Sequence, residues 1–210
     1  LFNLRRTLMN KSFIIKIIVF CLVTIKVSAI EKVILFGDSL MAGYGLPNEQ
    51  HLSVVLQRSL EFDGHNIKII NGSVSGSTSA GGLNIAEWTL SENNIDLMIL
   101  CLGANDMLRG INPKETKNNL EEIIQIAKNK NIKVIIAGMI APTSYGFAYK
   151  KSFDKIFSDL SKKHKLQLIP FLLEGVAQNP KFNLSDGMHP NDQGTIIIGN
   201  TLKKAILENL

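Results

Sequence analysis

The most reactive candidate in the sequence is Ser39, which follows the apolar run 33–36 in the stretch VILFGDSLMAGYGL. A serine hydroxyl at the end of a buried strand can act as a nucleophile if a base takes its proton and a third group orients that base. Gly, Asp and Ser are also the residues of an ordinary turn. Chemistry is therefore favoured only if the chain also supplies a base and an acid near this serine.

His189 is the histidine best suited to be that base. It lies in the sequence DGMHP, three residues after Asp186, and this spacing lets the carboxylate reach one ring nitrogen while the other faces outward. Alternatively, DGMHP is a plain turn before a helix, in which the aspartate caps backbone amides. Its combination with Ser39 favours the catalytic interpretation. The other histidines have neighbours typical of solvated surface: His51, His65 and His164.

An acyl-transfer site also needs hydrogen-bond donors for the oxyanion that develops in the transition state. The sequence offers the backbone N–H of Ser39, the backbone N–H of Gly76 between two serines, and the side-chain amide of Asn105 in GAND. Glycine and asparagine are common in loops, so each one alone is a weak signal. Their positions after successive apolar runs make the combination more informative.

Five short apolar runs are candidate strands, at residues 32–36, 67–70, 95–102, 132–140 and 166–171. Helix-like segments alternate with them, at residues 49–61, 79–92, 113–130, 145–163 and 191–209. Continuous hydrophobicity indicates strands that are covered on both faces. We therefore predict the α/β class: a three-layer α/β/α sandwich around a five-stranded parallel, flavodoxin-like sheet of order 2-1-3-4-5. Ligands bind beyond the carboxyl ends of such strands, where the polar candidates lie.

Residues 1–29 have the layout of a secretory signal peptide: basic residues without acids, an apolar stretch, and small residues before the expected cut. Lys16 interrupts the apolar stretch, which is shorter than the roughly 20 residues of a membrane span. We expect the mature chain to start near Ile30, with one domain over residues 30–210, exported to the periplasm or secreted. Translation is expected to begin at Met9.

Removing residues 1–29 also changes the charge balance. The whole chain has 23 basic and 18 acidic residues; the segment holds five basic residues and no acidic one, which leaves 18 of each. No net positive field remains to attract nucleic acid. Cys101 is then the remaining cysteine, so we expect a small buried hydrophobe without a disulfide partner. Trp88 is expected to lie in the core.

Four blocks of this sequence resemble those of the GDSL, or SGNH, hydrolases, over about residues 33–194. They are GDS after the first run, a glycine after the second, GxND after the third and DxxH before the last helix. LGANDMLRG and PTSYG are similar to the small bacterial branch of multifunctional arylesterases, thioesterases and lysophospholipases. Ala104 stands where many members of that branch have a second glycine.

The resemblance implies a role for each candidate. Ser39 would be the nucleophile, His189 the general base and then acid, and Asp186 the residue that orients it. Gly76 and Asn105 would join Ser39 in the oxyanion hole. No metal and no organic cofactor is implied. The substrate would be a small acyl ester, thioester or lysophospholipid, and we expect a monomer without a stable membrane span after signal removal.

Other residues of the same loops are expected to support the site or to line it. The two other acids near these loops, Asp38 and Asp106, are expected to brace their loops rather than to react. Apolar residues of the loops are expected to line an acyl groove: Met107, Leu108, Tyr145 and Phe147.

The leading hypothesis is an exported serine esterase that works through an acyl-enzyme on Ser39. A carbohydrate O-deacetylase of the same fold is the second, and a noncatalytic envelope binding protein is the third, although the complete set of candidates speaks against it. A metallophosphoesterase would need more histidines in the loops. An α/β-hydrolase would carry G-x-S-x-G around its serine, which GDSLM lacks.

Overall fold

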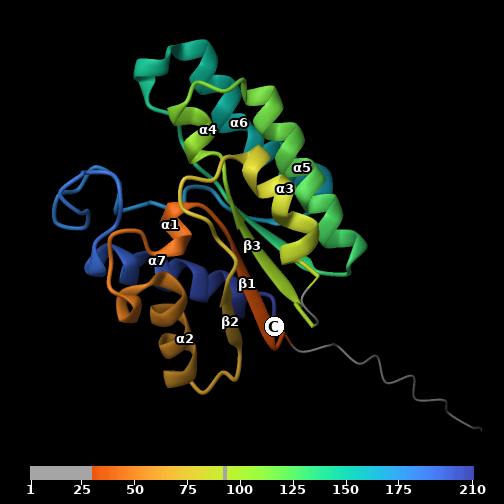
Figure 1. Ribbon diagram of the computed structural model, residues 1–210, viewed down its shortest axis with the longest axis vertical. Helices are drawn as coiled ribbons and strands as arrows, with labels where there is room; N and C mark the ends of the chain where they lie inside the picture. The colour runs from red at the N-terminus through yellow and green to blue at the C-terminus, as the bar shows by residue number, and fades with distance from the viewer. Residues whose placement is uncertain (1–29, 92–93) are drawn as a thin grey trace, which may run out of the picture.

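The structure is a computed structural model and describes residues 30–91 and 94–210. A parallel sheet lies between two layers of helices (Figure 1). Its strand order is β2-β1-β3-β4-β5, and every neighbouring pair is parallel. The three-layer fold and the strand order predicted from the sequence are confirmed. The expected signal segment, residues 1–29, lies outside the described residues.

The strands lie within or beside the five apolar runs. They are β1 (Lys32–Gly37), β2 (Lys68–Asn71), β3 (Leu97–Cys101), β4 (Lys133–Ala137) and β5 (Gln167–Ile169). Every residue of the central strand β3 is buried, whereas the edge strand β2 is half exposed. The predicted run 132–140 was too long for β4, because Met139 and Ala141 are buried in the loop that follows it. An apolar run indicates which residues are buried, and burial continues here beyond the last hydrogen bond that β4 makes in the sheet.

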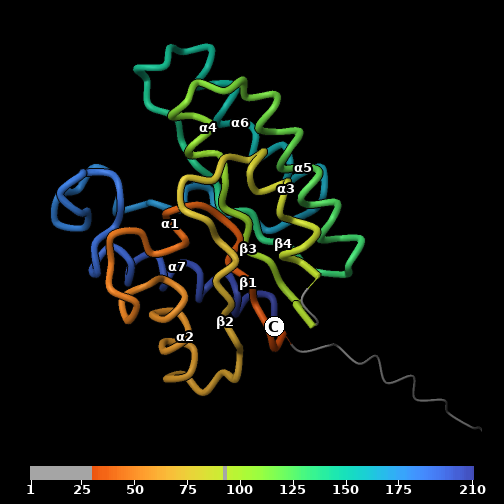
Figure 2. Tube along the Cα trace, in the orientation of Figure 1, coloured from red at the N-terminus to blue at the C-terminus, as the bar shows by residue number. Residues whose placement is uncertain are grey.

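The main helices agree with the predicted segments. The structure has α1 (Ser39–Ala42), α2 (Leu52–Phe62), α3 (Ser79–Thr89), α4 (Ala104–Leu108), α5 (Pro113–Asn129), α6 (Phe147–His164) and α7 (Asp192–Leu207), with 3-10 turns η1 (Asn48–Gln50) and η2 (Thr143–Tyr145). Helices α2 and α7 pack together on one face of the sheet, and α3, α5 and α6 cover the other (Figures 1 and 2). The short helices α1 and α4 were not predicted, because one turn carries no periodic signal. In the described part of the chain, no helix is both long and apolar enough to cross a bilayer.

Helix α5 shows how local sequence sets an element. The side chain of Asn112 accepts a hydrogen bond from the N–H of Lys114 at 3.0 Å, and Pro113 occupies the first turn, where its missing N–H costs nothing. Its apolar face is fully buried: Leu120, Ile123, Ile124 and Ala127. The helix therefore begins at a cap that the sequence specifies and lies against the sheet along one face.

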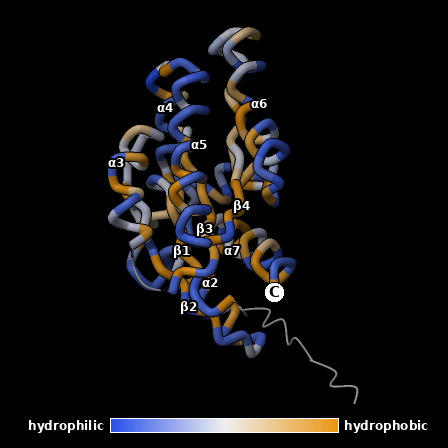
Figure 3. The backbone as a smooth tube through the Cα atoms, turned by 90° about the vertical axis from the view of Figure 1, so that its right-hand side faces the viewer, coloured by the Kyte–Doolittle hydropathy of each residue, from blue (hydrophilic) through white to orange (hydrophobic). Residues whose placement is uncertain are grey.

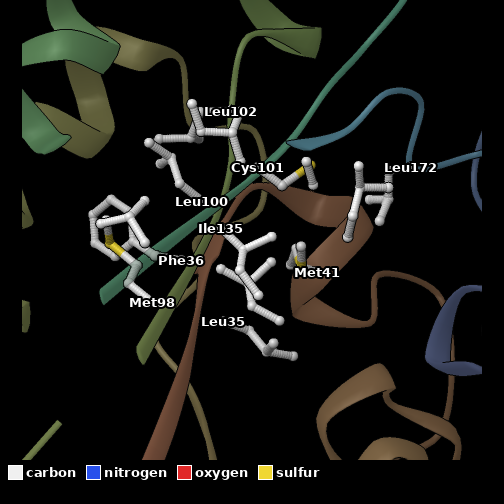
Figure 4. Packing of buried hydrophobic residues seen from close by; sticks show 14 of the residues in the cluster. Leu35, Phe36, Met41, Met98, Leu100, Cys101, Leu102, Ile135 and Leu172 are labelled. Atoms are coloured by element: carbon white, nitrogen blue, oxygen red, sulfur yellow. The ribbon is translucent and has the colours of Figure 1, made fainter. Parts of the chain in front are cut away.

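The core lies on both sides of the central strands. Figure 3 shows hydrophobic strands between helices that carry hydrophilic residues. At the carboxyl end, Met41 of α1 packs among core side chains that include Leu35 and Leu172 (Figure 4). Cys101 is free and buried there, as expected, and burial raises the pKa of its thiol well above the usual value. This packing gives the turn after β1 a rigid base.

The burial of two residues differs from the sequence-based expectation. Trp88 is 81% exposed, because α3 packs on the sheet through the small residues Gly82 and Ala86, and Trp88 lies on another side of the helix. The side chain of His164 is only 6% exposed rather than solvated, and its Nε2 lies 2.8 Å from a carboxylate oxygen of Glu121. Its place at the end of α6, packed on α5, explains the burial.

Candidate active site

Ser39 is held at the carboxyl end of β1 by a one-turn helix. Asp38 caps this helix by accepting a hydrogen bond from the N–H of Leu40 at 3.1 Å. Leu40 and Met41 are buried and anchor the turn in the core. A Cβ at Gly37 would lie 2.6 Å from the carbonyl oxygen of Cys101, so the strand needs glycine at this crossing. Ser39 therefore starts a short, rigid helix above the sheet.

The structure brings Ser39, His189 and Asp186 into one hydrogen-bonded relay. The Oγ of Ser39 lies 2.9 Å from Nε2 of His189, and Nδ1 of His189 lies 2.7 Å from Oδ2 of Asp186. A carboxylate accepts hydrogen bonds, so the neutral imidazole donates from Nδ1 and its Nε2 accepts from the serine hydroxyl. This is the tautomer that can take the proton of Ser39.

Asp186 contacts both the backbone of its own loop and the imidazole of His189. Its Oδ1 accepts from the N–H of His189 at 3.0 Å and of Met188 at 2.8 Å, while Oδ2 faces the imidazole. The backbone hydrogen bond from His189 is the largest cause that lowers the pKa of Asp186, to about 2. The carboxylate of Asp186 therefore makes both the backbone hydrogen bonds of a turn and the contact with the imidazole. It remains ionised over the whole neutral range.

Tyr44 lies against the imidazole, a contact that the sequence analysis missed. The centroids of the Tyr44 and His189 rings are 4.4 Å apart, and their planes are tilted by 37°. Tyr44 follows Ser39 by five residues, just beyond α1, and it is 52% exposed. An aromatic residue soon after the serine motif was the only signal for this contact in the sequence. The ring covers part of the histidine face from solvent.

The three candidate oxyanion donors line the same cavity as Ser39 and His189. Gly76 lies in the loop after β2 with φ of +78°, a left-handed conformation that favours glycine. Within the described residues, the N–H groups of Ser39 and Gly76 donate to no protein acceptor. The amide of Asn105, from α4, donates to the carbonyl of Ser77 at 3.1 Å and to Asp38 at 3.3 Å. These bonds fix the orientation of the asparagine.

The two additional acids are buried and hydrogen-bonded. Burial is the main cause that raises the pKa of Asp38 to about 6. Asp106 accepts hydrogen bonds from the N–H of Ser79 at 2.7 Å and from the hydroxyl of Thr116 at 3.1 Å. It therefore ties α4 to α3 and α5, in agreement with the bracing expected from the sequence. Neither carboxylate lines the cavity.

A cavity of about 1020 Å³ opens beside the relay. Met107 and Leu108 line it, as expected, but Tyr145 and Phe147 do not. Tyr145 packs on Tyr149 instead, with ring centroids 5.5 Å apart, and Phe147 is 81% exposed. Residues of the loops after β4 and β5 line the cavity in their place: Met139, Ile140, Phe171 and Leu173. Their signal in the sequence was the continuation of apolar residues beyond the strand ends.

The arrangement is suited to attack on a carbonyl carbon. It combines a hydroxyl with a base, an oriented carboxylate, free N–H groups and an apolar cavity. Over residues 30–91 and 94–210, no three His, Cys, Asp or Glu side chains gather in a group that could hold a metal ion.

Comparison with known proteins agrees with this chemistry. The GDSL-like Lipase/Acylhydrolase family matches residues 35–195. An arylesterase of Vibrio mimicus is 34% identical over 194 residues, which cover 92% of this chain and 96% of the relative. Thioesterase 1/protease 1/lysophospholipase L1 of Escherichia coli K12 is 30% identical over 185 residues, 88% of each chain. These names confirm the resemblance to the arylesterase, thioesterase and lysophospholipase branch.

Solved structures of esterases share the fold. The crystal structure of TesA superposes with a TM-score of 0.81 at 32% identity, and covers 86% of this chain and 100% of that chain. Esterase EstA from Pseudoalteromonas sp., inhibited by monoethylphosphonate, gives a TM-score of 0.81 at 28% identity, over 85% and 97%. The chain therefore belongs to the GDSL-like lipase/acylhydrolase family and is an enzyme that hydrolyses ester bonds.

Proposed function

We propose that this protein is an exported serine esterase that hydrolyses acyl esters or thioesters through an acyl-enzyme on Ser39. The observation that carries the proposal is the relay: Ser39 Oγ to His189 Nε2 at 2.9 Å, and His189 Nδ1 to Asp186 at 2.7 Å. Both distances suit proton transfer without a rearrangement of the site.

Acylation begins when Oγ of Ser39 attacks the carbonyl carbon and its proton passes to Nε2 of His189. The carbonyl oxygen becomes an oxyanion, which accepts hydrogen bonds from the N–H groups of Ser39 and Gly76 and from the amide of Asn105. For this, the N–H of Asn105 that donates to Asp38 at 3.3 Å in the free site turns to the oxyanion. The tetrahedral intermediate then expels the alcohol or thiol, which takes the proton back from the imidazolium. Asp186 holds the imidazole and stabilises its charge.

Deacylation repeats these steps with water. His189 takes a proton from a water molecule, the resulting hydroxyl attacks the acyl carbon, and the bond to Oγ of Ser39 breaks. The free acid leaves, and the proton returns from His189 to the serine. The same donors stabilise both tetrahedral intermediates, so one oxyanion hole serves both halves of the reaction.

The cavity supports an apolar acyl group as the recognised part of the substrate. Most of its lining side chains are apolar, and it opens next to the hydroxyl of Ser39. The relatives are named arylesterase, esterase and thioesterase/lysophospholipase, so simple esters, thioesters and lysophospholipids are the classes to test. A deacetylase for glycans would need polar groups for the sugar hydroxyls, and the lining includes Lys150, Glu174 and Gln178, so acetylated sugars belong in the same substrate test.

Export is the other part of the proposal. Residues 1–29 would direct the chain to the periplasm or out of the cell, and cleavage near Ile30 would release the domain 30–210. Ile30 is itself buried against the domain, which supports a boundary at this position. N-terminal sequencing of the protein recovered from cell fractions tests it: an uncleaved cytoplasmic product would contradict export.

The test of the chemistry compares Ser39→Ala with Ser158→Ala, a serine on α6 that donates to a backbone carbonyl of its own helix. Hydrolysis of p-nitrophenyl acetate and butyrate should be abolished in the first variant and unchanged in the second. An alkyl p-nitrophenyl phosphonate should add one phosphonyl group to Ser39, as detected by mass spectrometry. Turnover that survives in Ser39→Ala would end the proposal.

A further inference from the structure

We propose that Arg109 is a positioning residue, which acts on the reaction by holding Gly76 in its oxyanion-hole conformation. The inference rests on the proposed function, because it requires the N–H of Gly76 to be an oxyanion donor. Arg109 is outside the lining of the cavity beside Ser39, so its effect on the transition state would pass through Gly76.

The contact that carries this inference is a single hydrogen bond. Arg109 directly follows α4, and its Nη2 donates to the carbonyl oxygen of Gly76 at 2.9 Å. Arg109 does not line the cavity beside Ser39. In the part of the chain that the structure describes, no carboxylate pairs with its guanidinium. The guanidinium of Arg109 therefore interacts with the loop through the carbonyl of Gly76.

The loop of Gly76 has little packing to hold it. Residues 74–76 are exposed, and a Cβ built at Gly76 would meet nothing within 4 Å. The loop contains one turn bond of its own, from the N–H of Ser77 to the carbonyl of Val74 at 3.1 Å. A glycine without neighbours has a wide choice of backbone conformations, so its geometry must come from hydrogen bonds.

The N–H of Val74 donates to the carbonyl of Gly37 at 3.0 Å and holds the start of the loop, whereas the hydrogen bonds to the carbonyls of Gly76 and Ser77 come from α4 and the residue after it. Asn105 donates to the carbonyl of Ser77, and Arg109 donates to the carbonyl of Gly76, so two consecutive carbonyls are held by one short segment. Asn105 is itself a candidate oxyanion donor. The same segment therefore supplies one donor and fixes the peptide next to another, which keeps the two at a constant separation.

The consequence concerns the transition state rather than substrate binding. The hydrogen bond from Arg109 restrains the carbonyl of Gly76, and in this arrangement Gly76 has φ of +78° and an N–H without a protein acceptor. Without the arginine, the loop would sample conformations in which this N–H points elsewhere. Complete removal of an oxyanion donor lowers kcat by roughly 10²- to 10³-fold. Partial misplacement of the donor should cost less, about tenfold.

The experiment compares Arg109→Met and Arg109→Lys on the neutral ester p-nitrophenyl butyrate. We expect kcat to fall about tenfold in Arg109→Met with little change in KM, and Arg109→Lys to recover part of the loss because it keeps a charged donor. The second-order rate of inactivation by a neutral phosphonate, which mimics the tetrahedral intermediate, should fall in parallel with kcat.

Arg58→Met is the matched control, because Arg58 is also an arginine that donates to a backbone carbonyl, that of Glu49 at 3.3 Å, on η1. It should leave kcat unchanged. Thermal unfolding and titration of active sites correct each variant for unfolded protein. If Arg109→Met does not fold, Arg109→Gln and Arg109→Lys provide the same comparison.

Three results would overturn the inference: an unchanged kcat in the folded Arg109 variants, a loss confined to KM, or a loss seen only with anionic esters. The last two would mean that Arg109 binds the substrate directly. Ser39→Ala separates the two proposals. If it is inactive while the Arg109 variants are fully active, the role of Arg109 fails and the serine esterase stands.

Discussion

The aromatic ring of Tyr44 lies against the imidazole of His189, with centroids 4.4 Å apart. In the proposed reaction this imidazole becomes an imidazolium in both tetrahedral intermediates. The face of an aromatic ring attracts a cation, and at exposed sites this interaction contributes about 0.5–1 kcal/mol. Tyr44 is therefore in a position to favour the charged form of the base while it shields the ring from water.

Replacement of Tyr44 by Leu should lower kcat about twofold to fivefold on short p-nitrophenyl esters, because the apolar contact remains but the aromatic face is lost. Tyr44→Phe keeps the face and should retain nearly the wild-type kcat. Equal losses in both variants would instead assign the effect to the tyrosine hydroxyl.

Asp186→Asn should lower kcat by on the order of 10³- to 10⁴-fold, because a carboxamide NH2 facing Nδ1 favours the tautomer with a proton on Nε2. That tautomer cannot accept the proton of Ser39. The amide oxygen can still accept from the N–H groups of Met188 and His189, so the loop should keep its shape. Steady-state kinetics together with near-UV circular dichroism checks this prediction. A kcat near that of the wild type would argue against the relay.

The stability of the fold should depend on pH through Asp38. Burial raises the pKa of this carboxyl from 3.8 to about 6 in the folded protein, so the folded chain holds a proton that the unfolded chain releases. The free energy of unfolding should then fall as pH rises from about 4 to 6, and level off above, by up to about 3 kcal/mol.

Urea denaturation of the wild type and Asp38→Asn across pH 4–8 measures this effect. The free energy of unfolding of Asp38→Asn, relative to that of the wild type, should increase as pH rises through this window, since the amide cannot ionise. Parallel curves would show that Asp38 does not titrate there. The variant should also have a lower kcat, because the carboxylate oxygen that accepts from Asn105 is replaced.

Gly37→Ala should disturb the base of the site. The added Cβ would lie 2.6 Å from the carbonyl oxygen of Cys101, which belongs to the backbone of β3 and has little freedom to move. We expect a loss of about 1–3 kcal/mol in the free energy of unfolding and a lower kcat, because Ser39 follows two residues later.

Gly199→Ala is the control for Gly37→Ala, because it adds the same methyl group at a glycine that has room for it. Gly199 lies within α7, where an added Cβ would meet Val55 at an ordinary 3.6 Å. Alanine should stabilise the helix by up to about 1 kcal/mol and leave kcat unchanged. Chemical denaturation gives the free energy of unfolding of both variants. An unchanged value in Gly37→Ala would show that β1 and β3 can move apart without a loss of stability.

The sequence by itself was enough to predict the fold and to choose the candidate residues. Continuous apolar runs report burial on both faces, which occurs in parallel sheets covered by helices, and such sheets bind ligands at one edge. The polar blocks GDS, GAND and DGMHP follow these runs or precede the last helix, so their types and order were visible without coordinates. Strand ends were less predictable, because buried loops such as that of Met139 are as apolar as strands.

Only the tertiary structure decided the contacts between segments far apart in the chain. Ser39 and His189 are separated by 150 positions, and their distance of 2.9 Å depends on how α1 and the loop before α7 pack at the sheet edge. The same holds for Tyr44 on the imidazole, for Arg109 at Gly76 and for the exposure of Trp88. Local sequence specifies which groups are present and how each short element begins and ends. Distances between them arise from the packing of the whole core, which no short stretch of residues encodes.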